Sequence, residues 1–501
     1  MRKKKNKTLG PVTTIILITI IVMIITSILS LIGFEGQQTI ITNGILETYL
    51  ITIKNIFSIE GIKSFFGNSI INLQTFKPLF YLIMSLISLG IAERSGLLKA
   101  IAEKIKKLKF KYLTILVMTI SIISIFFGDY SFAFLMPFVA LIYKHIGKNP
   151  ILGIITVFLA LTLGYGLGIF YDYQDYSLGI MTELSAQVDV DKTYSFNLLS
   201  NLYIMIFSSA VLVIVCSNLI ETKIAPKFNN PEVKEDEIII SKEAGQYTLM
   251  ALMLLLLLII YLIIPGSPYM GFLLDKEQPK YIAMLLGDNS PFNIGFPYIV
   301  MIIMMICSFI YGKISKNIKT SYDYNEGLAA VFDKTGYIFV LIFFISQLIG
   351  LLEWTNIGNV ITVNLLDFMS GLQFSGLPLI FISFLIIVFI TILIPSSMDK
   401  WILFSPIIIP LFMRSNITPD YTQHMFSVAD SVGKVLTPIF PYYIIMLGLI
   451  YKYKNQNDIS LFGIIKLTFP VTMILSGLLL LILLSWFLIG LPLGINSFPS
   501  L

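Results

Sequence analysis

The sequence predicts an all-α polytopic membrane protein, with about nine transmembrane helices plus two re-entrant hairpins arranged as an inverted repeat. Of its 501 residues, 56% are hydrophobic and only 13% are charged, whereas soluble domains carry about 25% charged residues. The apolar residues gather in runs that reach the roughly 20 residues of a membrane-spanning helix. Two further runs, 111–146 and 375–414, are too long for one span and carry polar residues at their middles. No polar block is long enough to predict an attached soluble domain.

Nine apolar runs of span length lie between more polar segments. The first follows a basic N-terminus and exceeds the 7–15 residues of a signal-peptide core, so we expect it to remain as an uncleaved span. The seventh is expected to be broken. The expected spans are 12–33, 77–97, 149–171, 201–221, 247–265, 296–315, 336–366, 428–451 and 463–490.

Charged residues predict the orientation of the chain. Basic residues crowd the N-terminus (2–7) and the loop 94–111, and such clusters are typical of cytoplasmic ends rather than of nucleic-acid binding. The segment 172–195 is acidic and suits the outer face. Counting both long runs as hairpins places the N-terminus in the cytoplasm and the C-terminus outside. Two cysteines in apolar runs and two histidines in all argue against a disulfide framework or a zinc site.

The long run 111–146 has basic residues at both ends and Gly128, Asp129 and Tyr130 at its middle. Two ordinary spans would carry this middle across to the outer side. A re-entrant hairpin would instead stop it near the middle of the membrane, where non-helical backbone is tolerated if protein surrounds it. Both interpretations stay open, but an ionisable group with no lysine or arginine nearby in sequence favours the hairpin.

The second long run, 375–414, behaves in the same way from the opposite side, with the polar middle Pro395–Trp401. Each hairpin is followed by an interrupted span, 149–171 with Gly166 and Gly168, and 428–451 with a break ending at Pro438. A hairpin and a broken helix, occurring twice with opposite entry sides, form an inverted repeat. This pattern predicts a secondary transporter whose solute site lies near the membrane midplane.

The expected organisation has five parts. They are a first span and outer-face segment with surface helices (1–76), a first repeat (77–221), a cytoplasmic linker (222–246), a second repeat (247–490) and a C-terminal tail (491–501).

Asp129 is the only charged residue from Leu113 to Tyr143. Acids inside a membrane segment are functional candidates by default, because burial of a carboxylate is costly. Such a group could take up and release a proton. The alternative is a structural carboxylate that caps the hairpin by accepting backbone N–H groups.

The middle of the second hairpin offers hydroxyl groups and an exposed helix N-terminus, which attracts anions. Ser396 and Ser397 could donate to a solute, while Trp401 is either an aromatic plane in the site or a packing residue. Asp399 and Lys400 are expected to neutralise each other.

Asp430 and Lys434 lie four residues apart, the spacing of an i,i+4 ion pair on a helix. Inside a membrane such a pair would cancel charge without a bound cation. The alternative is a helix that begins near Ser427, which would leave both residues close to the outer interface.

Several residue groups match the motifs of one transporter family in order along the chain. With them, the chain resembles the AbgT family of p-aminobenzoyl-glutamate transporters, in a superfamily of elevator-type carriers, over roughly 80–490. The groups are Ala92–Leu98; Asp129 with Pro137 and Gly147–Pro150; Asp175 with Thr182; Lys400-Trp401 with Pro406; Pro419; and Asp430-Ser431-Val432 with Thr437-Pro438 and Pro441-Tyr442.

The resemblance implies a homodimer in a prokaryotic-type plasma membrane that moves aromatic carboxylates related to folate breakdown, or exports antimetabolites such as sulfonamides by antiport. It carries the family's functional aspartate over to Asp129, its tryptophan to Trp401 and its proline, as a structural residue, to Pro419. From the residues themselves we expect coupling to the proton-motive force, with Na⁺ as the alternative, and no cofactor. We likewise expect proton coupling at Asp129 and Asp430 and a structural role for Pro438. The residues that we expect to bind the solute are Ser396, Ser397, Trp401, Lys434, Gly166 and Gly168.

The chain departs from the family where amide side chains are expected. The family's asparagines fall on Gly168, Thr391 and Lys434, its arginine before the D-S-V motif falls on Ser427, and its G-S-A-S-A tip reads Pro395–Asp399. Oxygen ligands suit hard cations, and these are missing here. Our hypothesis is that the Lys434 ammonium replaces a bound Na⁺.

Other functions stay open at this stage. The solute could be a dicarboxylate, an amino acid or a short-chain fatty acid, and a passive channel is a further alternative. Tyr171-Asp172 and Gly128-Asp129 weakly resemble the motifs of an intramembrane aspartyl protease, but position 126 is phenylalanine and the two motifs come in reverse order.

Overall fold

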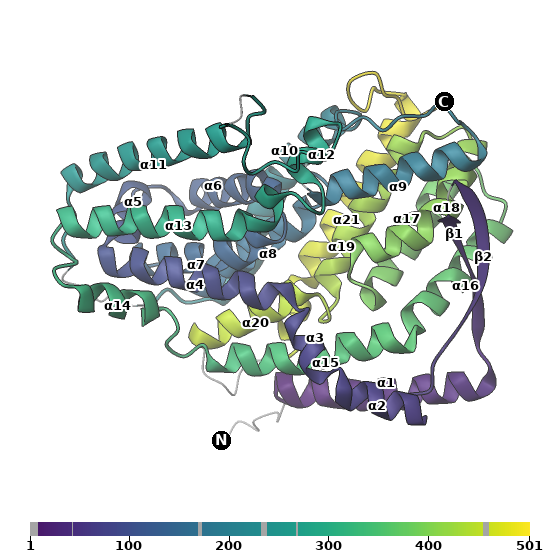
Figure 1. Cartoon of the computed structure of the whole chain (residues 1–501), viewed down its shortest axis with the longest axis horizontal. Coiled ribbons are helices and arrows are strands. Elements are labelled where there is room, and N and C mark those ends of the chain that lie inside the picture. The colour runs from purple at the N-terminus through teal and green to yellow at the C-terminus, as the bar shows by residue number, and fades with distance from the viewer. Residues whose placement is uncertain (1–8, 43, 169–172, 232–237, 267–268, 454–459) are drawn as a thin grey trace.

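The computed structural model describes residues 9–42, 44–168, 173–231, 238–266, 269–453 and 460–501. Helices dominate these residues, and Figure 1 shows many of them running nearly parallel along the long axis of the molecule. The elements are α1 (Pro11–Ile32), β1 (Glu35–Thr42), β2 (Ile45–Thr52), α2 (Ile59–Gly67), α3 (Ser69–Gln74), α4 (Lys77–Ser95), α5 (Leu97–Ile105), α6 (Phe110–Ile123), η1 (Ser124–Phe127), α7 (Tyr130–His145), α8 (Pro150–Gly164), α9 (Tyr173–Asp189), α10 (Leu202–Leu219), η2 (Ile220–Ile224), η3 (Ala225–Lys227), α11 (Lys242–Ile263), α12 (Tyr281–Leu286), α13 (Pro291–Ile314), α14 (Ser321–Ala330), α15 (Gly336–Thr355), α16 (Ile357–Gly371), α17 (Gly376–Leu393), α18 (Ser397–Arg414), α19 (Pro419–Leu436), α20 (Pro441–Tyr453) and α21 (Gly463–Ile489).

Nine helices are long and apolar enough to cross a membrane within the described residues, so the predicted polytopic membrane protein is confirmed. Seven of them correspond to predicted spans: α1, α10, α11, α13, α15, α21, and α19 together with α20. The others are α6 with η1, and α17. The predicted span 77–97 is instead part of a bent pair, since α4 and α5 meet at 76°. The predicted span 149–171 contains α8, which is shorter than a full span.

The prediction of surface helices throughout 34–76 is wrong for its first half. Residues 35–42 and 45–52 form two antiparallel strands in which Thr42 pairs with Ile45 and Glu35 with Thr52. The signal was present in the sequence, because an Asn-Gly pair (43–44) between segments rich in Thr, Ile and Tyr is typical of a hairpin turn. In Figure 1 the two strands lie along one edge of the molecule, where β1 packs against α16 and α18. The second half contains the expected short helices, α2 and α3.

The long run 111–146 forms two helices separated by a short break. Helix α6 continues into η1, the chain turns at Gly128 with a φ of 56°, and α7 begins at Tyr130. Glycine suits this turn because it lacks the Cβ that makes a positive φ costly. The span that follows is also interrupted, because α8 ends at Gly164 and a turn occupies 165–167.

The second long run has the same form, since α17 ends at Leu393 and α18 begins at Ser397. The span after it breaks between α19 and α20, at Thr437–Phe440. Helix α19 begins at Pro419 and not near Ser427, so Asp430 lies well inside it and Lys434 lies in its last turn. The predicted break in 336–366 also occurs, at Asn356, whose φ of 58° separates α15 from α16.

The linker expected at 222–246 is shorter than predicted. The helical path of α10 continues through η2 and η3 to Lys227, and α11 already begins at Lys242. At the other end of the chain, the tail folds back onto α19: the Thr418 N–H donates to Pro499 O at 3.1 Å, and the Ser497 hydroxyl donates to Asp420 at 3.0 Å. The tail therefore caps the N-terminus of α19.

Candidate functional site

A cavity of about 990 Å³ lies where the broken elements meet, and we call it the central cavity. Both breaks of the long runs line it: Gly128–Tyr130 from the first, and Pro395–Asp399 from the second. The two turns expected to meet therefore share one space. Further lining comes from β1, α3, α4, α9, α13, α15, α16, α19 and the start of α20.

Ionisable side chains of both signs line the central cavity, and they come from five different parts of the chain. Asp129 and Lys434 come from the first break and from α19, and the remaining ones are Lys77, Glu353 and Asp399. Aromatic rings fill much of the wall between them. Within the described residues, no cluster of three or more His, Cys, Asp or Glu side chains is placed to hold a metal ion.

Asp129 occupies the N-cap position of α7, but its carboxylate makes no capping hydrogen bond to the helix backbone. The Tyr165 hydroxyl, from the first broken span, donates to Asp129 Oδ1 at 3.1 Å. The buried hydroxyls of Tyr130 and Tyr442 also belong to cavity-lining residues. The hydroxyl of Tyr442 lies beside the Asp129 carboxylate. The capping alternative is thus not what the structure shows, and Asp129 lines the cavity beside tyrosine hydroxyls.

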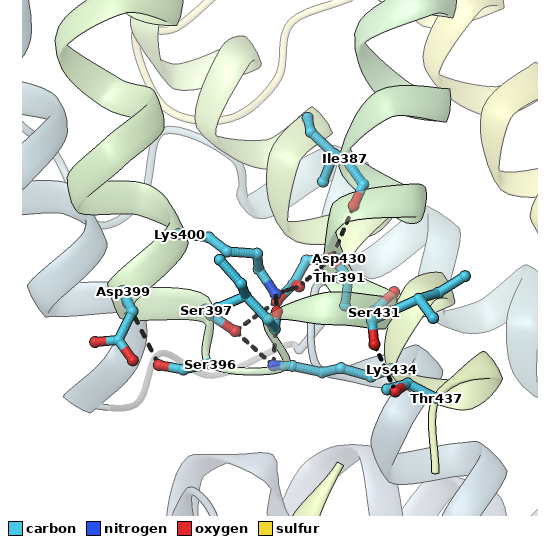
Figure 2. A network of polar contacts seen from close by, with 12 residues as sticks. Ile387, Thr391, Ser396, Ser397, Asp399, Lys400, Asp430, Ser431, Lys434 and Thr437 are labelled. Atoms are coloured by element: carbon cyan, nitrogen blue, oxygen red, sulfur yellow. Dashed lines mark hydrogen bonds and ion pairs between the residues drawn. The ribbon is translucent and has the colours of Figure 1, made fainter. Parts of the chain in front are cut away.

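Asp430 lies at the centre of a buried charged cluster (Figure 2). Its Oδ1 is paired with Lys400, and its Oδ2 lies 3.1 Å from Lys434 Nζ, so the predicted i,i+4 ion pair is confirmed. Only 2% of Asp430, 0% of Lys400 and 3% of Lys434 is exposed. Two ammonium groups therefore share one carboxylate, and the cluster has an excess of one positive charge when all three groups are ionised.

Hydroxyl groups complete the coordination of Asp430. Thr391 donates to Oδ1 at 2.9 Å, and Ser397 donates to Oδ2 at 2.5 Å. The Lys434 ammonium in turn donates to the Ser397 oxygen at 2.5 Å and lies 4.2 Å from the centre of the Tyr165 ring. Because Ser397 is the first residue of α18, this network joins the second break to α19.

The expected pairing of Asp399 with Lys400 does not occur. Lys400 turns away from its neighbour, towards Asp430, and donates to Ile394 O at 2.7 Å. Asp399 is exposed to the central cavity, and its backbone N–H donates to the Ser396 side chain, the N-cap of α18. Consecutive residues of a helix point about 100° apart, so a sequence neighbour was a poor guide to the partner of Lys400.

Trp401 and the glycines of the first broken span do not line the central cavity. Trp401 is fully buried; its indole N–H donates to Leu178 O and Thr182 Oγ1, both at 3.1 Å, and its ring centre lies 4.4 Å from that of Phe426. These contacts fasten α18 to α9 and α19. Gly166 and Gly168 are also buried, and neither is among the residues that line the cavity.

Gly166 allows close contact between the first broken span and α19. A Cβ at this position would collide with the backbone oxygen of Ser427 and lie 2.7 Å from the Val428 nitrogen. We therefore expect Gly166→Ala to destabilise the protein by about 1–3 kcal/mol, because a helix backbone cannot yield cheaply. The matched control is Gly477→Ala, since a Cβ at Gly477 meets nothing within 4 Å. Equal melting temperatures for the two purified variants would contradict this prediction.

The two prolines assigned structural roles lie at helix ends. Pro419 is the first residue of α19, where a missing N–H costs nothing, and Pro438 lies in the break between α19 and α20. Asp172, which a protease mechanism would require, lies outside the described residues.

The sequence analysis did not predict a place in the site for four of its residues: Lys400, Thr391, Tyr165 and Tyr442. Lys400 and Thr391 carried one usable signal, because polar side chains within long apolar runs need buried partners. The two tyrosines gave no such signal, since tyrosines occur throughout the chain.

Comparison with known proteins places the chain among transporters. The sequence model of the AbgT putative transporter family matches residues 2–501. The p-aminobenzoyl-glutamate transport protein of Escherichia coli (strain K12) is 27% identical over 502 residues, covering 99% of this chain and 95% of that protein.

Two solved transporter structures share the fold. The Alcanivorax borkumensis YdaH transporter matches with a TM-score of 0.51 at 23% identity, covering 97% of this chain and 100% of that one. Neisseria gonorrhoeae MtrF, described with a class of antimetabolite efflux pumps, matches with a TM-score of 0.50 at 23% identity, covering 98% of both chains.

Proposed function

Because the chain belongs to the AbgT transporter family, a family of carriers and not of enzymes, we propose that it is a secondary active carrier of small anionic solutes. The solutes include aromatic carboxylates of the p-aminobenzoyl-glutamate type and related antimetabolites. The observation that carries this proposal is the meeting of both broken elements at one cavity, whose lining includes both Asp129 and Lys434.

The second break supplies the features that an anion requires. Lys434 lines the cavity, and Ser396 adds a hydroxyl at the N-terminus of α18. The hydroxyl of Ser397 is already donated to Asp430. Backbone N–H groups at a helix N-terminus attract carboxylates, and the 18-residue α18 is long enough to have a substantial dipole. A solute carboxylate would bind here, and the aromatic wall would accommodate an apolar or aromatic body.

The proposed transport unit consists of two repeats, 77–221 and 247–490, related by inverted topology. In each, a re-entrant hairpin and a broken helix hold the cavity near the middle of the membrane. The N-terminus lies in the cytoplasm and the C-terminus outside. In an elevator-type carrier, a homodimer would form through the part of each subunit that stays fixed in the membrane. The elements around the cavity would move relative to that part.

We assign proton coupling to Asp129 in preference to Asp430. Asp129 faces the cavity and accepts one hydrogen bond from a tyrosine. Asp430 is held by two ammonium groups and two hydroxyls, and this environment strongly favours the charged carboxylate. Protonation of Asp129 would compensate the charge of an incoming anion.

Transport should not require sodium. Lys434 provides a covalently attached cation at Asp430 and Ser397, which leaves no need for a dissociable one. We expect replacement of Na⁺ by choline to leave uptake into proteoliposomes unchanged within about twofold, because coupling then rests on protons. Uptake that stops in choline buffer and returns with Na⁺ would refute this assignment.

The proposed solute class is tested by a thermal-shift screen of the purified protein with and without Na⁺. The panel contains p-aminobenzoyl-glutamate, benzoate, dicarboxylates, short-chain fatty acids and neutral amino acids. Stabilisation by aromatic anions supports the proposal. Stabilisation by dicarboxylates, fatty acids or amino acids alone would assign the carrier to another solute class, and stabilisation by none of the anions would contradict it.

A further inference from the structure

The two lysines on Asp430 differ in what else they contact. Lys400 is completely buried, is not one of the cavity-lining residues, and donates to Ile394 O within the second break. Lys434 lines the central cavity and donates to Ser397. Lys400 is therefore a permanent counter-ion of Asp430, whereas Lys434 can contact a solute that enters the cavity.

Ser397 is the point where Lys434 acts on the second break (Figure 2). Its hydroxyl donates to Asp430 and accepts from Lys434, each at 2.5 Å. If Lys434 moved away, Asp430 would keep Lys400, Thr391 and Ser397 as partners. One carboxylate would then face one ammonium group, so the cluster can release Lys434 without leaving a buried charge unpaired.

We infer that Lys434 is a releasable pin that fastens the second break to α19, and that an anionic solute opens the pin by binding the Lys434 ammonium. This inference rests on the proposed function, since it requires an anion in the central cavity. A solute carboxylate offers Lys434 the same charge-assisted hydrogen bonds as Asp430 and Ser397. When the solute binds, Lys434 exchanges the Asp430 carboxylate for that of the solute. The start of α18 then loses its hydrogen bond from Lys434 to Ser397.

The pin itself can be tested without any solute. The chain has only two cysteines, and both are buried, so a cysteine at Met398, next to Ser397, reports the mobility of the break through its rate of maleimide labelling. Lys434→Met should raise this rate roughly tenfold, because a hydrogen bond from a charged group is lost. Lys434→Arg should restore it at least in part.

Two controls separate a pin from general loosening. Thr391→Val removes another hydrogen bond to Asp430 without touching Ser397, and it should leave the labelling of the Met398→Cys reporter unchanged. An Asn359→Cys reporter on α16, which also lines the cavity, should not respond to Lys434→Met. An unchanged rate at Met398→Cys, or an equal rise at both reporters, would overturn the inference.

A second measurement adds p-aminobenzoyl-glutamate. It should raise labelling of Met398→Cys when Lys434 is present and cause no further rise in Lys434→Met. An unchanged or lowered rate, for a probe that stabilises the protein in the thermal-shift screen, would contradict release by the solute. If no anion stabilises the protein, the proposed function fails, while the solute-free comparison still decides whether Lys434 is a pin.

Discussion

Asp430→Asn is expected to destabilise the folded protein by about 3–5 kcal/mol, the usual cost of breaking a buried ion pair. The substitution leaves Lys400 and Lys434 beside each other without the carboxylate that both contact. Lys400 is the more severely affected, because it is completely buried and cannot turn to the cavity. The expected result is a sharply reduced yield and a strongly lowered melting temperature of the purified protein.

The control is the double variant Lys400→Met/Asp430→Asn. It removes the completely buried ammonium of Lys400 together with the carboxylate, so that only Lys434, which lines the cavity, stays charged and the cluster returns to the net charge of the wild type. Replacement of a buried ion pair by apolar groups is often close to neutral. We expect the double variant to recover most of the stability that Asp430→Asn loses. If the single variant melts like the wild type, or if the double variant is no better than the single one, the two-lysine cluster does not have the energetic role assigned to it.

Asp129→Asn is expected to abolish solute accumulation driven by a pH gradient while leaving the fold intact. Asparagine keeps an oxygen that can accept from Tyr165 at the position of the present 3.1 Å hydrogen bond, but it cannot take up a proton. Because the neutral side chain still fits a cavity that binds an anion, exchange of labelled for unlabelled solute should persist. Proteoliposome assays of accumulation and of exchange, on the same preparation, separate these two activities.

A matched comparison strengthens this test. Tyr165→Phe removes the hydrogen bond but keeps the ionisable carboxylate, so it should retain coupled accumulation even if its affinity falls. Accumulation by Asp129→Asn under a pH gradient, at the wild-type level, would remove Asp129 from the coupling mechanism. Loss of exchange as well as accumulation would instead assign Asp129 to solute binding.

Much of the fold follows from where charged residues are missing. The two interrupted runs, 111–146 and 375–414, could be predicted close to their final bounds because buried helices tolerate few unpaired charges. The few polar residues inside each run marked its break. The strands at 35–42 and 45–52 were missed because the mixed apolar and charged composition of 34–76 was interpreted as surface helices. The Asn-Gly pair in the sequence between them was the better guide.

The site was predicted in part, for a physical reason. The pair Asp430–Lys434 could be predicted, since a spacing of four residues fixes both side chains on one face of a helix. The second lysine could not, because the partner of Lys400 lies on another helix and depends on how α18 packs on α19. Trp401 shows the same limit: its buried contacts with Leu178 and Thr182 depend on tertiary structure that no local pattern contains.

The central claim is that one cavity, lined by Asp129 and Lys434, binds the transported solute. The most direct test is a cryo-electron microscopy map of the protein in lipid nanodiscs, with the anion that stabilises it most in the thermal-shift screen. We expect density for the anionic group beside Lys434 and Ser396, and density for the solute body extending towards Asp129. Solute density elsewhere, with this space left unchanged, would contradict the account.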